Sequence, residues 1–255
     1  MSLILIHEIA VEGKRLGRHI DSRAVEHRAV SGPPPLANEL RSVKHPSSPN
    51  LPLNQQDTSA CTAHAYAAAV NTVPHWAPGA PAVDQAQVWP IYSLEEQDLF
   101  GSPYPPTDQG GSGQAVCEAA ENLGFGSSFN YAANIHEILL SLVLRPGIAG
   151  VNWYTSFDVC PTDTGIVEIA PDATVRGGHE ICATELVVPA GVTVHNMLQS
   201  LDQIQVWFWQ SWGLQFGLND SGRFGMTAAT LSTLLSEGGD FKVPRTLPGW
   251  VAPTA

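Results

Sequence analysis

The chain has 255 residues, of which 44% are hydrophobic and 14% are charged, and its formal net charge is −12. The apolar fraction is large enough to build a core, and the length suits one domain or two small lobes. The negative charge argues against nucleic-acid binding, which needs a basic face. No apolar run approaches the roughly 20 residues of a membrane-spanning helix. We therefore expect neither nucleic acid nor a membrane as a partner.

The charge is unevenly distributed along the chain. Residues 1–50 carry seven basic and five acidic side chains, whereas residues 51–255 carry five basic and nineteen acidic ones. Six prolines between residues 30 and 53 indicate an extended connector. This pattern predicts an N-terminal arm and linker over 1–50 and a body over 51–255, with the arm adding little to the core. Two interpretations stay open: a variable tail, or a basic arm that docks on this chain or on a partner.

Three helices are predicted in the first part of the body. Alanine-rich residues 62–71 follow Cys61, and alanine is the best helix former. A second helix is expected between a Ser112 cap and a Gly124 stop. Residues 134–143 form the third candidate, which Arg145-Pro-Gly closes.

The second half is richer in β-branched and aromatic residues, which favour strands. Helices followed by strands indicate an α+β protein with two lobes. The expected strands lie near 148–154, 166–169, 179–188 and 204–209, and a late helical segment begins at Thr227.

The four cysteines provide one candidate nucleophile and no metal site. No pair of them has the C-x-x-C spacing of a structural zinc site, and two disulfides remain open. Cys61 stands at the predicted start of a helix, where free N–H groups and the helix dipole favour an anion. The thiol could therefore ionise near neutral pH and react as a nucleophile. A lone cysteine is otherwise read as a buried core residue. The cysteines are Cys61, Cys117, Cys160 and Cys182.

Four ordered motifs over residues 51–243 resemble the papain-like cysteine peptidases, especially divergent members from bacteria and their phages. Gln55 precedes Cys61 by six residues, His179 opens an apolar strand, and Gln210-Ser-Trp-Gly follows another. Asp108-Gln-Gly-Gly resembles the segment with which this family binds an extended substrate backbone. The distances from Cys61 to His179 and to Gln210 are close to those expected for such enzymes.

The resemblance implies a two-lobed fold, with a helical lobe over about 51–145 and an antiparallel, β-barrel-like lobe over about 146–255. It also implies a thiol endopeptidase that needs no cofactor or metal and hydrolyses peptide or protein substrates through an acyl-enzyme. Cys61 would then be the nucleophile, His179 its base, Gln210 the residue that orients the histidine, and Gln55 an oxyanion donor that matters for turnover and not for folding. The substrate-binding positions would be Gly110, Gly111 and Trp212.

The sequence departs from the family pattern at the orienting residue, because the family uses Asn where this chain has Gln210. The side chain is one methylene longer, yet its oxygen can still accept the imidazole N–H. We expect that oxygen within hydrogen-bond reach of His179, with Trp212 packed over the pair. The alternative function is a weak or inactive papain-like module with a structural or binding role, for example in a phage particle; acyl transfer to another acceptor is a third class. No secretory signal is evident, so a cytoplasmic or virion-associated location is expected.

Overall fold

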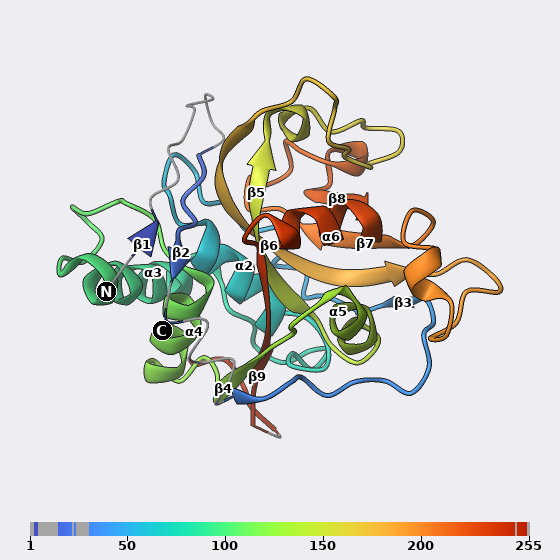
Figure 1. The fold of residues 1–255 in the computed structure, drawn as a ribbon. Helices are drawn as coiled ribbons and strands as arrows, with labels where there is room; N and C mark the ends of the chain where they lie inside the picture. The colour runs from blue at the N-terminus through green and yellow to red at the C-terminus, as the bar shows by residue number, and fades with distance from the viewer. Residues whose placement is uncertain (1–2, 5–14, 22, 24–30, 248, 254–255) are drawn as a thin grey trace.

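The computed structural model of the chain describes residues 3–4, 15–21, 23, 31–247 and 249–253. Figure 1 shows helices α2, α3 and α4 gathered on one side of the molecule, and α5 and α6 beside the strands of a large sheet. None of the helices in the described part combines the length and apolar character needed to cross a membrane. The helices are α2 (Cys61–Val70), α3 (Gln85–Phe100), α4 (Gly113–Asn122), α5 (Ile135–Leu142) and α6 (Ala228–Ser236), with short 3-10 turns at Thr155–Asp158, Met197–Gln199 and Leu218–Asp220.

The three helices predicted before residue 145 are confirmed as α2, α4 and α5. Every residue of α2 is buried, which its alanines permit because they allow close approach of neighbouring elements. A further helix, α3, was not predicted. It begins with a capping box formed by Asp84 and Gln87 and ends at Gly101 in the left-handed conformation. Pro90 lies inside it, and an internal proline normally argues against a helix.

The sheet has seven strands and pairs antiparallel throughout. Its order is β4-β9-β5-β6-β7-β8, and β3 pairs with β6 beside this path. The sheet is open, because β4 and β8 lie at opposite ends of the order, so the predicted barrel-like closure is too strong a description. The expected strand at 166–169 is reduced to an isolated bridge between Ile166 and Gly225. The strands are β3 (Val43–Lys44), β4 (Ser128–Tyr131), β5 (Gly147–Tyr154), β6 (Val175–Val187), β7 (Gln205–Trp209), β8 (Arg223–Thr227) and β9 (Asp240–Arg245), with a separate pair β1 (Leu3–Ile4) and β2 (Ile20–Asp21).

The described parts of the N-terminal arm, residues 15–21 and 31–50, contribute side chains to the core, contrary to the expectation that the arm adds little to it. Leu16 and Leu40 are buried in the same apolar cluster as α5 and the central strands. Strand β3 extends the sheet by pairing Val43 with Leu186. The sequence did not predict these contacts, because isolated apolar residues in a proline-rich region form no helical or strand pattern.

Candidate active site

Cys61 is the first residue of α2, as the sequence predicted. The preceding residue, Ala60, carries no polar side chain to cap the helix, so the N–H groups of the first turn and the helix dipole favour an anion here. The Cys61 side chain is fully buried. The backbones of Glu180 and Gly17 lie close enough to the thiol to favour its ionised form. Because Glu180 directly follows His179, the thiol lies beside the part of β6 that carries the imidazole.

His179 is buried and contacts two tryptophan rings. Its Nε2 lies 2.6 Å from Oε1 of Gln210, and the Trp212 ring stacks on the imidazole with centroids 5.1 Å apart. Trp153 meets the imidazole edge-on. The expected Gln210 bond and the expected cover by Trp212 are therefore confirmed. Since an amide oxygen can only accept, Nε2 carries the proton, and in a neutral ring Nδ1 is then free to take one.

The longer side chain of Gln210 is accommodated by folding back on its own backbone. Its Oε1 accepts a hydrogen bond of 2.7 Å from the backbone N–H of Ser211, and the Ser211 hydroxyl oxygen lies 3.2 Å away. The Gln210 backbone N–H donates to the Gly222 carbonyl at 2.9 Å. These bonds fix the amide oxygen that faces His179, so the extra methylene does not remove the orienting contact.

Gln55 connects the loop before α2 to the segment after β7. Its Oε1 accepts a bond of 2.5 Å from the Ser211 hydroxyl, and its backbone N–H donates to the Ser211 carbonyl at 2.8 Å. Its Nε2 donates to the Thr58 carbonyl at 2.6 Å and to the Arg15 carbonyl at 3.1 Å. The side chain is fully buried, so it supports the fold as well as presenting a donor.

The Gly110–Gly111 segment is held by two glutamates of α3 that sequence reasoning missed. Glu96 Oε1 accepts hydrogen bonds from the N–H groups of Gln109 and Gly110 at 2.7 and 2.8 Å. A Cβ on Gly111 would lie 1.9 Å from Glu95 Oε1, so only glycine fits there. Both carboxylates are buried, and burial raises their pKa. Predicting helix α3 would have drawn attention to these two glutamates. The helix was not predicted because Pro90 lies inside it.

Residues 15–21, which we call the arm segment, run between the Gly110–Gly111 segment and β6. The Gly17 N–H donates to the Gly178 carbonyl at 3.2 Å, next to His179 in the chain. On the other side, Gly111 donates to the Gly17 carbonyl at 2.7 Å and accepts from the His19 N–H at 2.6 Å. The arm segment therefore occupies the backbone-binding position that the resemblance assigns to a substrate.

The reactive groups are neutral in this arrangement. Burial raises the pKa of the Cys61 thiol well above its usual value. Burial also lowers the pKa of His179 to about 3, and Arg176 adds to this while the Gln210 bond opposes it. At neutral pH both groups are therefore uncharged. The thiolate expected from the helix start therefore does not form in this arrangement.

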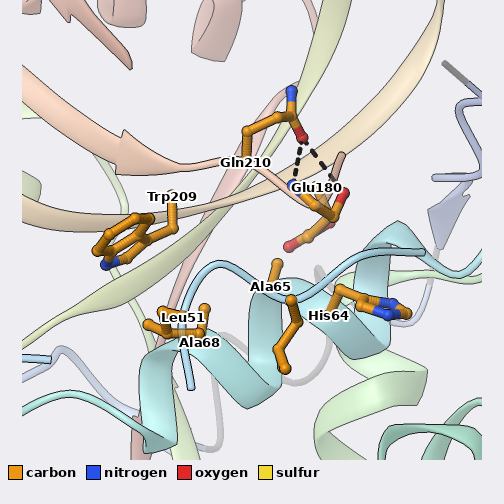
Figure 2. A pocket seen from close by; sticks show the side chains of 9 residues that line it. Leu51, His64, Ala65, Ala68, Glu180, Trp209 and Gln210 are labelled. Carbon is orange, nitrogen blue, oxygen red and sulfur yellow. Dashed lines mark hydrogen bonds between the residues drawn. The ribbon is translucent and has the colours of Figure 1, made fainter. Parts of the chain in front are cut away.

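The back of the site is closely packed. Figure 2 shows a pocket between α2, which contributes His64, Ala65 and Ala68, and the strand side, which contributes Glu180 and Gln210. Its volume is about 10 Å³, which leaves room for no organic ligand. In the described part of the chain, no group of three or more His, Cys, Asp and Glu side chains could hold a metal ion.

A buried group of charges lies beside Glu180 on the opposite face of β6 from His179. Arg18 Nη2 of the arm segment is 3.0 Å from Asp240 Oδ2, and its Nε is 4.0 Å from Glu180 Oε2. Lys242 also bonds to Asp240. No motif marks these residues in the sequence; the only signal is that Asp240 and Lys242 alternate within an apolar strand, which places both on one face.

The pH dependence of stability should reveal the burial of Glu180. Burial raises its pKa from 4.5 to about 7; Lys242 and Arg18 oppose the rise and Asp240 adds to it. The folded chain then binds more protons than the unfolded chain, so this contribution is present below about pH 4.5 and is lost as the pH rises to about 7. We therefore compare the free energy of unfolding of Glu180→Gln with that of the wild type. The difference in favour of the variant should be larger by roughly 1–3 kcal/mol at about pH 7.5 than at about pH 4.5. Urea unfolding at both pH values measures this difference, and an equal gain at both would contradict it.

No family model matches the sequence, and no curated protein matches it. Solved structures do match the fold. Xylellain, a cysteine protease from Xylella fastidiosa, is 15% identical, with 95% of this chain and 96% of that chain covered and a TM-score of 0.57. ProCathepsin B S9 from Trypanosoma congolense is 13% identical over 94% of this chain and 87% of that chain, with a TM-score of 0.58.

A third match is the bromelain protease from Ananas comosus, solved in complex with the E64 inhibitor. It is 11% identical over 81% of this chain and 99% of that chain, with a TM-score of 0.54. These three proteins are papain-like cysteine proteases, and the likeness extends over most of each chain. The chain has the papain-like fold.

Proposed function

We propose that the chain is a thiol endopeptidase that cleaves peptide bonds in peptide or protein substrates. The observation that carries the proposal is the hydrogen bond from His179 Nε2 to Gln210 Oε1 beneath Trp212, together with a thiol at the start of α2 whose neighbour, Glu180, directly follows His179 in the chain. An amide that orients one imidazole nitrogen leaves the other for proton transfer with a nucleophile. The papain-like fold supports this assignment of roles.

In the proposed mechanism, His179 Nδ1 takes the Cys61 proton as Sγ attacks the substrate carbonyl carbon. The carbonyl electron pair moves to oxygen, and the resulting anion is stabilised by Gln55 Nε2, the group that donates to the Arg15 carbonyl in this structure. The C–N bond then breaks and the leaving amine takes the proton from His179. Water, activated by His179, hydrolyses the acyl group on Cys61 and restores the thiol.

Labelling by an epoxysuccinyl peptide, which alkylates nucleophilic cysteines, tests the proposal. We expect a single adduct on Cys61, located by peptide mapping, in the Gly17→Ala chain, where an added Cβ would lie 1.9 Å from the Ser59 backbone oxygen and would displace the arm segment. The reason is that Cys61 stands at the start of a helix. The adduct should be absent when Cys61→Ala is added and should form more slowly when His179→Ala is added. Cys160→Ala is the matched control and should be labelled like the Gly17→Ala chain. Modification of all four cysteines at similar rates would contradict the proposal.

The second candidate is a papain-like module without catalysis, with a structural or binding role, for example in a phage particle. The observation in its favour is that Cys61 is fully buried and that the arm segment is bonded on both sides. In that case no adduct forms on Cys61 in Gly17→Ala even after extended incubation.

A further inference from the structure

Arg18 is the only arginine of the arm segment whose side chain is fully buried in the body. Its residue is 1% exposed, and its Nη2 donates to Asp240 Oδ2 at 3.0 Å and to the Gly238 carbonyl at 3.3 Å. Burying a charge is costly unless it is paired. The groups around the Arg18 side chain therefore have to be acidic. They belong to the body of the chain and not to the arm.

The pocket around Arg18 is shaped for a long side chain. A Cβ on Gly150 of β5 would lie 2.5 Å from Arg18 Nε, 2.8 Å from Glu180 Oε2 and 2.9 Å from Asp240 Oδ1. Glycine at this position thus keeps open the space that the guanidinium fills. Both Glu180 carboxylate oxygens are buried, and within the described part of the chain neither accepts a hydrogen bond. The pocket therefore contains acceptor capacity that Arg18 does not use.

The backbone of Arg18 is bound where a substrate would bind under the proposed function. Arg18 and Gly111 form a parallel bridge, through the bonds of Gly111 to the residues on either side of Arg18. The Arg15 carbonyl, three residues earlier, accepts from Gln55 Nε2 and from Trp212 Nε1 at 3.1 and 3.2 Å. A side chain in this pocket is therefore within three residues of the carbonyl at the proposed oxyanion donor.

We propose that the pocket formed by Gly150, Glu180 and Asp240 selects an arginine side chain of the peptide substrate, and that Arg18 occupies it in this structure. With Arg18 present, two cations face two carboxylates, because Lys242 is the other cation. Without Arg18 only Lys242 faces the two carboxyl groups, and a cation that enters the pocket regains the bonds to Asp240 and to the Gly238 carbonyl. The carbonyl of Gly238 and the carboxylate of Asp240 suit the planar, multi-donor guanidinium better than an ammonium group. This inference rests on the proposed function.

The test uses the full-length Gly17→Ala/Arg18→Ala chain, in which the pocket loses the Arg18 side chain and the Cβ of residue 17 prevents the arm segment from docking. Internally quenched peptides carry arginine, its neutral isostere citrulline, lysine or leucine at each position within three residues of the cleaved bond. A hydrogen bond to a charged group contributes about 1.5–3 kcal/mol, so at one position kcat/KM should be about 10- to 100-fold higher for arginine than for citrulline. Asp240→Asn and Glu180→Gln, each added to the Gly17→Ala/Arg18→Ala chain, should reduce this ratio.

Glu185→Gln is the matched control, because Glu185 lies on the same strand but pairs with Arg223; it should leave the ratio unchanged. If Arg18→Ala does not fold, Arg18→Gln replaces it. Hydrolysis without an arginine preference at any position would overturn the pocket assignment and leave the peptidase standing. Failure to hydrolyse any peptide would overturn the proposed function and this inference with it.

A measurement independent of catalysis accompanies the assay. Methylguanidinium at millimolar concentration should raise the Tm of Arg18→Ala, because it restores the missing cation, and should not raise that of the wild type. Methylammonium should have a smaller effect on the variant. Equal effects of both ions on variant and wild type would contradict a guanidinium-selective pocket.

Discussion

Replacing Gly17 by alanine should increase the rate at which iodoacetamide modifies Cys61 by about 10- to 100-fold. An added Cβ would lie 1.9 Å from the backbone oxygen of Ser59. Ser59 cannot easily move, because its N–H is bonded to Asp108 Oδ1 at 2.8 Å. Overpacking of this kind typically costs about 1–3 kcal/mol, which here is lost from the docked arm segment. The thiol then becomes exposed and its pKa falls.

The rate is followed by peptide mapping at neutral pH. In the wild type we expect Cys160 to react first, since it is the one cysteine that is partly exposed, whereas the other three are buried. Asn38→Ala is the control, because Asn38 is an exposed residue of the same N-terminal region. If Gly17→Ala and Asn38→Ala show the same Cys61 rate as the wild type, the arm segment does not control access to the thiol.

The parts of the site that could be predicted from sequence depend on short-range signals. Cys61 at a helix start follows from the alanine run behind it and needs no knowledge of the rest of the fold. The contact between His179 and Gln210 was predicted from the resemblance alone, and the amide oxygen fulfils the expected role despite its longer side chain. The Gln210 side chain reaches this position because its Oε1 also accepts a hydrogen bond from the Ser211 N–H. No sequence pattern predicts that bond.

The parts that could not be predicted depend on tertiary contacts between distant segments. In the sequence, Glu95 and Glu96 have the pattern of exposed residues. In the structure, α3 places both in a buried position beside the Gly110–Gly111 segment. Arg18 looks like one of several scattered basic residues, and only the fold places it between Asp240 and Glu180. The excess of basic residues in residues 1–50 shows that this region is positively charged. It does not show that Arg18 is the residue whose side chain is inserted into the body.

Gln55→Glu should lower kcat by about 10²- to 10³-fold, the usual effect of losing one oxyanion donor. The comparison is made in the Gly17→Ala background, where the site is open. Glutamate has the same shape as glutamine but replaces the Nε2 donor by a carboxylate oxygen, which repels the developing anion. KM should change much less than kcat, because the donor acts on the charge of the transition state.

Both glutamate and alanine at position 55 lose the Nε2 bond to the Thr58 carbonyl, but glutamate keeps the shape of the side chain and the acceptor for Ser211. Gln55 Oε1 accepts from the Ser211 hydroxyl at 2.5 Å, and truncation would leave that buried hydroxyl without this partner, which costs about 1–3 kcal/mol. A glutamate oxygen can still accept that bond, and thermal unfolding of each variant reports any stability that is lost in addition. Gln56→Glu introduces the same charge at the exposed neighbouring position and should leave kcat within about threefold of the background. If Gln55→Glu keeps the turnover of the background on a good substrate, the group that bonds the Arg15 carbonyl in this structure is not the oxyanion donor, and stabilisation must come from the N–H groups at the start of α2.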